Sequence, residues 1–333
     1  MEILQITWLV LLAVLLAAFL ICGGFDFGAG MLLCRMSKES KARAMLEIAP
    51  FWDGNQVWLI TAGGALFAAF PKAYALVLSN LYIPVILLLT ALIFRVVAIE
   101  FFLALGGEKW RGFWAAVCCV SSVLSMALVG VALGAMFGGQ ILQKVDGGFW
   151  ANFARLFTPM TIAAGILTVV FCLAQGSVYL GLKNVGDEKF FASARNMLSL
   201  LAVAYIAYIF LFMLYGKSQV LPRGLTVGVL FAAYLPITIA VRTARRKMMK
   251  TAFFMTSLFA LVCVAAHVLG TFPYIVSPFG ASEGVDIYAA SSSKATLRIM
   301  LGVAVIGVPL ALGYFIYSHF VFSKKRGGSV GGY

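Results

Sequence analysis

Long apolar segments alternate with short polar ones along the whole chain. Nine segments are apolar over roughly the 20 residues that a helix needs to cross a bilayer. They cover residues 6–33, 48–70, 77–104, 114–137, 159–182, 197–215, 225–241, 252–274 and 297–322. The pattern predicts an all-α integral membrane protein with about nine transmembrane helices and short connections between them.

Two of these segments have unusual features. The seventh, at 225–241, is the shortest and contains Pro236. A proline is tolerated in a span because neighbouring helices can satisfy the carbonyl that it frees. The first segment has no basic region before it, and its only early charge is Glu2. We therefore expect it to be a membrane span and not a cleaved signal peptide. The longest connections, about 138–158 and 275–296, are too short to be domains.

The composition excludes a soluble protein. Of the 333 residues, 63% are hydrophobic and only 11% are charged, whereas a soluble domain is about half apolar and a quarter charged. A second, soluble catalytic domain is excluded as well. The net charge of +13 would indicate nucleic acid as a partner of a soluble protein, but in a membrane chain excess Lys and Arg mark the cytoplasmic connections. We expect no nucleic-acid partner.

The basic residues fall mainly on one side when successive connections are placed on alternate sides of the membrane. This side collects 17 of the 25 basic residues, the other side collects seven, and Arg95 lies inside a span. The sorting predicts an N-terminus outside and a C-terminus in the cytoplasm. An even number of helices would spoil it, so charge supports nine spans independently of hydropathy. The larger group comprises Arg35, Lys38, Lys41, Arg43, Lys109, Arg111, Lys183, Lys189, Arg195, Arg242, Arg245, Arg246, Lys247, Lys250, Lys324, Lys325 and Arg326.

Ligands for haem or metal are scarce. The two histidines are His267, inside an apolar segment, and His319, near the C-terminus. The six cysteines lack the CxxC spacing of metal or redox sites. Haem and metal centres generally use histidine or thiolate ligands, so we expect no metal site, no haem of this chain's own, and a hydrogen-bonded interior role for His267. No Walker loop, GxGxxG turn or HExxH motif occurs. Any redox chemistry would use a partner's cofactors.

Four charged residues lie inside the first three spans or at their ends, namely Asp26, Asp53, Arg95 and Glu100. Such groups are costly in a membrane, which makes each a candidate for function. The first and third spans run inward and the second runs outward, so all four are expected at a similar depth near the cytoplasmic surface. Arg95 and Glu100 are five residues apart and point in different directions. We expect each to pair with a neighbouring helix.

Two interpretations of this polar cluster remain open. In one, the charges form buried ion pairs or interfacial anchors that hold helices together. In the other, the carboxylates and their polar neighbours form a proton entry that faces the cytoplasm. Asp53 and Gln56 share a helical face, whereas Asn55 lies about 200° from Asp53. Trp52 is typical of the interfacial aromatic belt. A polar cluster alone does not distinguish a pump, a transporter and an oxidase.

Small residues mark further candidate contacts between helices. Gly23–Gly30 and Gly63–Ala65 are rich in glycine, which permits close helix approach, and we expect them to contact a partner subunit. Gln175-Gly176-Ser177 is a second polar site in an apolar segment, and we attribute it to helix packing.

Several specific motifs are distributed along the chain from the first span to the last. The strongest is Pro50-Phe51-Trp52-Asp53-Gly54-Asn55-Gln56-Val57-Trp58-Leu59. The others are Gly24-Phe25-Asp26-Phe27-Gly28, Gly63-Gly64-Ala65-Leu66-Phe67-Ala68-Ala69-Phe70-Pro71 with Tyr74, Phe94-Arg95, Gln175-Gly176, Thr271-Phe272-Pro273-Tyr274, and Ser291-Ser292-Ser293 with Thr296-Leu297. Over the whole chain, this set resembles subunit II of the cytochrome bd quinol oxidases.

The resemblance implies a heterodimer in the bacterial cytoplasmic (inner) membrane. Subunit I of that family carries two b-type haems and one d-type haem, oxidises quinol and reduces dioxygen to water. Subunit II holds no haem, scaffolds subunit I and contributes to a proton path from the cytoplasm. A quinone can also occupy subunit II as a structural ligand. The resemblance therefore implies subunit I, quinol or quinone, and lipids as partners, and it leaves open a small single-helix subunit.

The family fold implied by the resemblance has two pseudo-symmetric four-helix bundles, here about 6–137 and 159–274, and a ninth helix at 297–322. The proton-path aspartates fall on Asp53 and Asp26. An acidic residue that commonly precedes Gly-Phe-Asp in the family is replaced here by Gly23 and Gly24, and Ala289 and Ala290 stand where many members have an aspartate. The predicted proton path comprises Asp53, Asp26, Trp52, Asn55, Gln56, Glu100 and Arg95, with no catalytic or metal-binding residue in this chain.

Two other functions remain as alternatives. A proton-coupled secondary transporter could use the same inner carboxylates, and a haem-free quinone-binding anchor would need no catalytic chemistry. Transporters tend to place their sites near the bilayer midplane on broken helices. The charges here are expected near one surface, which favours the oxidase subunit.

Overall fold

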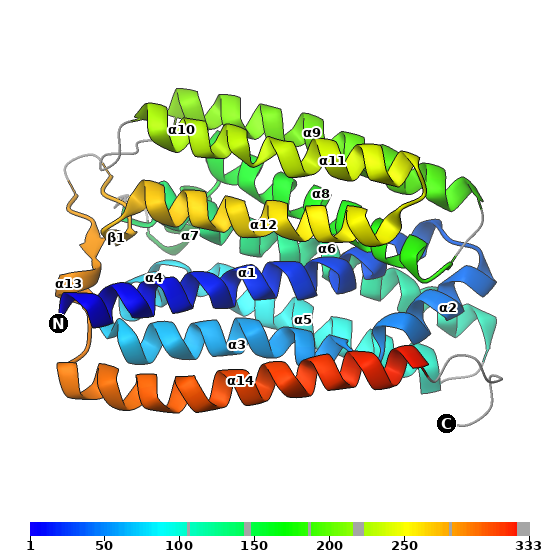
Figure 1. Ribbon diagram of the computed structural model, residues 1–333, viewed down its shortest axis with the longest axis horizontal. Helices are drawn as coiled ribbons and strands as arrows, with labels where there is room; N and C mark the ends of the chain where they lie inside the picture. Colours follow the sequence, from blue (N-terminus) through cyan, green and yellow to red (C-terminus); the bar gives the residue numbers. More distant parts are fainter. Residues whose placement is uncertain (105–106, 143–147, 186–187, 216–222, 280–281, 325–333) are drawn as a thin grey trace.

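The computed structural model describes the chain except for residues 105–106, 143–147, 186–187, 216–222, 280–281 and 325–333. Long helices run side by side along the length of the molecule (Figure 1). In the described part of the chain, the strands form one small pair at an end of the helix bundle. The predicted all-α membrane fold is confirmed.

Eight helical stretches in the described part of the chain are long and apolar enough to cross a membrane. One of them joins two shorter helices, α10 and α11. The helices concerned are α1 (Glu2–Leu32), α5 (Tyr82–Ala104), α6 (Glu108–Phe137), α8 (Pro159–Leu182), α9 (Glu188–Tyr215), α10 (Arg223–Ala232), α11 (Tyr234–Arg245), α12 (Met249–Thr271) and α14 (Lys294–Lys324).

The remaining predicted span is α3 (Trp52–Ala69), an 18-residue helix that packs along α1. It lies between α1 and α14 in Figure 1. Its first turns contain Asp53, Asn55 and Gln56, which makes α3 less apolar than the other eight stretches. All nine predicted segments are therefore mainly helical.

The structure corrects two of the predicted boundaries. The segment 48–70 begins in a turn after α2 (Lys38–Ile48), and the segment 77–104 contains the end of α4 (Pro71–Asn80) before α5. Phe70 separates α3 from α4 with a non-helical backbone. Pro71 then starts α4, a position where its missing N–H is not needed. Apolar residues continue through these turns, so hydropathy did not reveal them.

Pro236 interrupts the seventh predicted span. The chain forms α10 and α11 with a break at Ala233. Proline has no N–H, so the carbonyl of Ala232 loses the donor that would lie four residues further along the helix. The proline is accommodated, as predicted, at the cost of helix continuity.

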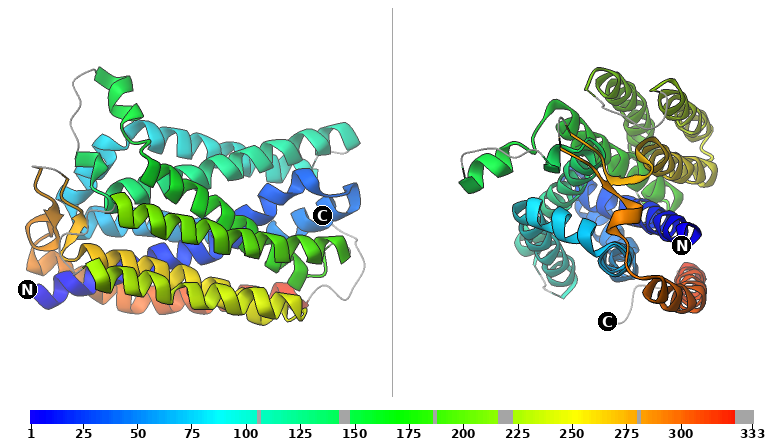
Figure 2. Two further views of the ribbon diagram at one scale, coloured as in Figure 1. Left: turned by 90° about the horizontal axis from the view of Figure 1, so that it is seen from above. Right: turned by 90° about the vertical axis from the view of Figure 1, so that its left-hand side faces the viewer.

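The connections at the two ends contain short elements. These are η1 (Leu33–Arg35), η2 (Gln140–Leu142), α7 (Gly148–Ala154), the antiparallel strands β1 (Tyr274–Val276) and β2 (Val285–Asp286), and α13 (Ile287–Ala290). The α7 helix stands out from the bundle in Figure 2. The long predicted connections are thus partly folded without forming a domain.

Helix burial places α8 at the centre of the bundle and α14 at its edge. In the most apolar window of α8, 61% of residues are buried, against 6% for α14. The central helix packs against α1, α6, α9 and α12. It therefore joins the helices of the two predicted bundles. The division into two pseudo-symmetric bundles and a ninth helix stays a prediction.

The N-terminal end of α14 is attached to α1 and α3. Ser292 donates from its N–H to the Ala69 carbonyl at 2.9 Å and from its hydroxyl to the Ala68 carbonyl at 2.7 Å. The Trp8 indole N–H donates to the carbonyl of Leu297 at 3.1 Å. These bonds hold α14 at the end of the molecule where the N-terminus lies (Figure 1).

The opposite end, at the right in Figure 1, carries most of the described basic residues. We call it the basic end. It contains Arg35–Arg43 around α2, Lys109–Arg111 at the start of α6, Lys183 after α8, and Arg242–Lys250 at the turn between α11 and α12. The predicted sorting of these residues to one end is confirmed. The assignment of that end to the cytoplasm stays a prediction.

Candidate functional site

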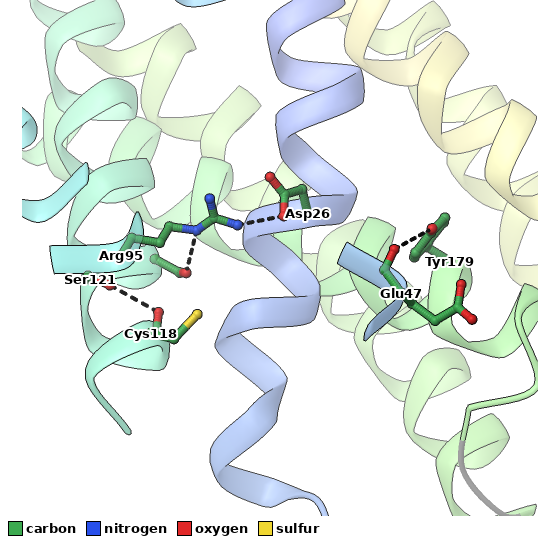
Figure 3. A network of polar contacts seen from close by, with 7 residues as sticks. Asp26, Glu47, Arg95, Cys118, Ser121 and Tyr179 are labelled. Atoms are coloured by element: carbon green, nitrogen blue, oxygen red, sulfur yellow. Dashed lines mark hydrogen bonds and ion pairs between the residues drawn. The ribbon is translucent and has the colours of Figure 1, made fainter. Parts of the chain in front are cut away.

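An ion pair between two fully buried side chains joins α1 to α5. The Arg95 Nη2 atom lies 2.5 Å from Asp26 Oδ1, and neither side chain is exposed (Figure 3). Arg95 Nε donates to the Ser122 hydroxyl of α6 at 3.2 Å. The guanidinium carbon lies 4.1 Å from the centre of the Phe27 ring, a cation–π contact. One guanidinium thus holds three helices together.

Several polar atoms around this pair have no hydrogen-bond partner among the described residues. They are Asp26 Oδ2, Arg95 Nη1 and both amide atoms of Asn55. Asn55 is fully buried in the first turn of α3, close to the Asp26 carboxyl, and neither of its amide atoms makes a hydrogen bond among the described residues. Buried polar atoms without partners are costly, and in native proteins ordered water often satisfies them. The pair therefore lies in a region with unused hydrogen-bonding capacity.

The other acidic residues of the predicted path lie on the surface of this chain. Asp53 is exposed in the first turn of α3, two residues before Asn55, and Glu100 is exposed on α5. Trp52 and Gln56 are half-buried. A carboxylate in a first helical turn interacts favourably with the helix dipole. The structure brings Asp26, Arg95 and Asn55 together and leaves Asp53 and Glu100 outside that cluster.

The expectation that Arg95 pairs with a neighbouring helix is confirmed, and its partner is Asp26. No ion pair to Glu100 is present among the described residues. Ser122 and the Phe27 ring were not predicted as members of the site. The signal for Ser122 is the Ser121-Ser122 pair inside an otherwise apolar segment.

The second polar site joins α8 to α12. Gln175 Nε2 donates to the Ser257 hydroxyl at 3.0 Å, and its carbonyl oxygen accepts from the Thr256 hydroxyl. Both ends of the buried amide are therefore paired. This confirms the predicted packing role for this position.

Glycine brings the backbones of α1 and α8 into contact. A Cβ atom at Gly28 would lie 1.7 Å from the Cys172 carbonyl oxygen, and one at Gly176 would lie 2.3 Å from the Gly28 carbonyl carbon. The expectation that Gly23–Gly30 contacts a partner subunit is therefore wrong, because these residues are buried against other helices of the same chain. The glycines of Gly63–Ala65 have nothing within 4 Å and remain available to a partner.

His267 is a hydrogen-bonded interior residue, as predicted. Its Nε2 atom lies 2.5 Å from the Tyr208 hydroxyl, and its Nδ1 atom lies 2.7 Å from the Cys263 carbonyl oxygen. Both rings line a pocket between α6, α9 and α12 with about 490 Å³ of empty space, part of it open to the surroundings. His319 lies outside the residues whose side chains the structure describes. Within the described residues, no three potential ligands gather into a metal-binding group.

Helix α2 is held against the bundle at the basic end. The Tyr179 hydroxyl donates to the Glu47 carbonyl at 3.2 Å (Figure 3), and the Glu47 carboxylate lies 3.7 Å from the Lys183 ammonium. Burial lowers the pKa of Lys183. An exposed ion pair of 2.6 Å joins Lys38 to Glu108, and this hydrogen bond raises the pKa of Lys38. Residues of α2 thus contact both halves of the chain.

Known proteins similar to this chain match it over nearly its whole length. The family model for cytochrome bd terminal oxidase subunit II matches residues 4–322. The cytochrome bd-I ubiquinol oxidase subunit 2 of Escherichia coli (strain K12) is 30% identical over 351 residues, covering 94% of this chain and 92% of the relative. The cytochrome bd ubiquinol oxidase subunit 2 of Bacillus subtilis (strain 168) is 31% identical over 324 residues, covering 96% and 95%.

The fold agrees with a solved structure. A chain in the structure of bd oxidase from Geobacillus thermodenitrificans superposes with a TM-score of 0.78 at 19% identity, covering 96% of this chain and 99% of that one. At this identity the likeness concerns the fold alone. Because the family model spans nearly the whole sequence and two relatives match along almost their full lengths, this chain belongs to the cytochrome bd terminal oxidase subunit II family.

Proposed function

We propose that the chain is the haem-free subunit II of a quinol:oxygen oxidoreductase of the bd type. It scaffolds a subunit I that carries two b-type haems and one d-type haem, and it supplies part of a proton path for the reduction of dioxygen to water. Relatives named as ubiquinol oxidase subunits support quinol as the reductant. Family membership favours this function over the proton-coupled transporter that the sequence left open.

The position of Asp53 beside the buried polar cluster carries the proposal of a proton path. Asp53 is exposed at the beginning of α3, and Asn55, two residues further, is buried close to Asp26. A carboxylate at the membrane surface can take up a proton where water ends and release it inward by changing its protonation state. The unpaired polar atoms of Asn55, Asp26 and Arg95 offer hydrogen bonds to water molecules beyond that point.

The proposal places the basic end in the cytoplasm. Asp53 then faces the compartment from which protons are taken, and the N-terminus lies outside. The excess of Lys and Arg at this end supports the assignment through the positive-inside rule. Quinone binding by this chain and a small single-helix subunit stay predictions from the resemblance.

An Asp53→Asn variant tests the path directly. Asparagine keeps the size and most hydrogen bonds of aspartate but has no titratable proton. We expect the complex to assemble with its haems and its oxidase turnover to fall roughly tenfold or more, since a group that transfers protons contributes about 10²-fold or more in acid–base catalysis. Stopped-flow spectra should show that proton-coupled haem steps slow more than electron entry.

A matched control separates this effect from the loss of one surface charge. Glu39 is exposed at the same end, in the first turn of α2 and outside the predicted path. Glu39→Gln should leave turnover unchanged. Loss of the assembled complex in Asp53→Asn would indicate a scaffolding role, and an assembled variant with normal turnover across pH would exclude both roles.

A second prediction concerns the haems. His267 is already paired with Tyr208 and the Cys263 carbonyl, so it has no free nitrogen for a haem iron. His267→Gln should therefore leave the haem content of the purified complex unchanged, as measured from its reduced-minus-oxidised spectrum and the protein concentration. A missing haem band would contradict the haem-free assignment of this chain.

A further inference from the structure

Five basic residues crowd the turn between α11 and α12. Arg242, Arg245, Arg246, Lys247 and Lys250 are all exposed. The described ion pairs of the chain involve none of Arg242, Arg245, Arg246 and Lys250. Among the described residues, this turn is the densest positive patch at the basic end, and we call it the α11–α12 patch.

The surrounding sequence offers little to neutralise the α11–α12 patch. From Lys189 to Ser282 the chain contains no aspartate or glutamate. Elsewhere at the basic end, by contrast, Lys38 pairs with Glu108 and Lys183 lies near Glu47. The positive charges of Arg242, Arg245, Arg246 and Lys250 are thus left for a ligand from outside the chain.

Exposed apolar side chains continue from the patch along both helices. On α12, Phe254 follows Lys250 by one turn and is 62% exposed, and Leu261 lies two turns further at 43%. On α11, Leu235 is 63% exposed and precedes Arg242 by two turns. Residues spaced by four or seven share a helical face. Each helix therefore exposes apolar surface on the same face as a basic side chain, two residues on α12 and one on α11, and we call these the apolar stripes.

The two stripes belong to one surface region. Helices α11 and α12 pack against each other and lie side by side in Figures 1 and 2, with their shared turn at the basic end. The axial distance from Lys250 to Phe254 is about 6 Å at 1.5 Å per residue. A phosphate held at the level of Lys250 would therefore place the start of a lipid chain at the level of Phe254.

From this arrangement we infer that the α11–α12 patch binds the phosphate group of anionic phospholipids, with their acyl chains along α11 and α12. Basic clusters next to membrane spans attract anionic lipid headgroups. A free phosphate would use the basic residues but not the apolar stripes. An acidic segment of a protein would leave the stripes uncovered. The continuity of charge and apolar surface favours a lipid.

The test uses the purified oxidase complex with subunit I. Native mass spectrometry would measure retained phosphatidylglycerol, added at a series of concentrations, with phosphatidylcholine as the neutral comparison. In the variant Arg242→Gln/Arg245→Gln/Arg246→Gln/Lys250→Gln, we expect phosphatidylglycerol binding to weaken by roughly fivefold for each charge removed, as each basic residue near an anionic surface contributes about one factor of that size. Phosphatidylcholine binding should not change.

The control removes four charges from elsewhere at the same end. In Lys41→Gln/Arg43→Gln/Lys109→Gln/Arg111→Gln, phosphatidylglycerol binding should stay close to that of the unmodified complex. Equal losses in the two variants would overturn the proposal, since they would show attraction to the net charge alone. Displacement of the lipid by millimolar inorganic phosphate would also overturn it, in favour of a free phosphate ligand.

A further pair of variants keeps the test informative if the fourfold change prevents insertion. Two double variants, Arg242→Gln/Lys250→Gln and Arg245→Gln/Arg246→Gln, each remove two charges. In each, the logarithm of the loss in phosphatidylglycerol affinity should be about half of that in the fourfold variant. Substitution of the three arginines by lysine preserves charge and should retain the lipid. Unchanged binding in both double variants would contradict the proposed site.

Discussion

Gly28→Ala is expected to prevent the packing of α1 on α8 and to remove most of the folded chain. The added methyl carbon would lie 1.7 Å from the Cys172 carbonyl oxygen and 2.9 Å from the Gly176 nitrogen. Both are backbone atoms, which cannot rotate away as a side chain can. Overpacking in a core costs about 1–3 kcal/mol and occasionally more. We expect the upper end of that range or beyond, because two central helices would have to separate.

The measurement is the yield of monodisperse complex in detergent and its thermal unfolding midpoint. Gly228→Ala is the matched control, because Gly228 is an exposed glycine within α10 with nothing within 4 Å of its added carbon. It should behave as the unmodified chain does. Gly176→Ala should fail as Gly28→Ala does, since the two residues face each other. Similar yields for Gly28→Ala and Gly228→Ala would show that α1 and α8 are less closely packed than described.

Arg95→Met is expected to destabilise the chain by about 3–5 kcal/mol, the typical cost of removing one partner from a buried ion pair. The Asp26 carboxylate would lose its counter-charge inside the bundle, and the Ser122 hydroxyl would lose a donor. Arg95→Lys should cost less, because it keeps the charge but gives up the planar group that contacts Ser122 and the Phe27 ring.

A double variant distinguishes the cost of an unpaired charge from the value of the pair. Replacing a buried ion pair by apolar residues of similar size is often neutral or stabilising. Asp26→Leu/Arg95→Met should therefore recover much of the stability lost in Arg95→Met, as measured by thermal unfolding of the four proteins of the cycle. A double variant as unstable as the sum of the single variants would contradict this explanation. Recovered stability with low oxidase turnover would show that the pair also serves the reaction.

The apolar segments predicted the spans well because a bilayer leaves the backbone few alternatives to a helix. The predicted ends were less accurate. Between α3 and α4, the turn at Phe70 is itself apolar and buried, so hydropathy continues through it. At the start of α3 the error is reversed. Its residues are polar, although they belong to a helix that packs along α1.

The sequence could predict that Arg95 pairs with a neighbouring helix, but not which residue is its partner. Asp26 and Asp53 are both carboxylates on neighbouring spans, and the rotation of each helix decides which one faces the guanidinium. Asn55 lies about 200° from Asp53 around α3, so burial of Asn55 turns Asp53 toward the surface. That rotation depends on the packing of α3 against α1, which a single sequence does not contain.

The glycines of the first span illustrate a second limit. Small residues allow close approach whether the neighbouring helix belongs to the same chain or to another. The sequence therefore predicted a tight contact at Gly28 but assigned it to a partner subunit. The structure supplies the missing fact, which is that Gly176 of α8 occupies the space beside it.

The attachment of α14 sets an order for the biogenesis of the chain. The bonds from Ser292 to Ala68 and from Trp8 to Leu297 join positions 224 and 289 residues apart. The ribosome makes the acceptors on α3 and the donor on α1 before it makes α14. Contacts between such distant positions form slowly. Docking of α14 must therefore wait until α1 and α3 lie side by side in the membrane, so α14 joins a bundle that the two earlier helices have already begun.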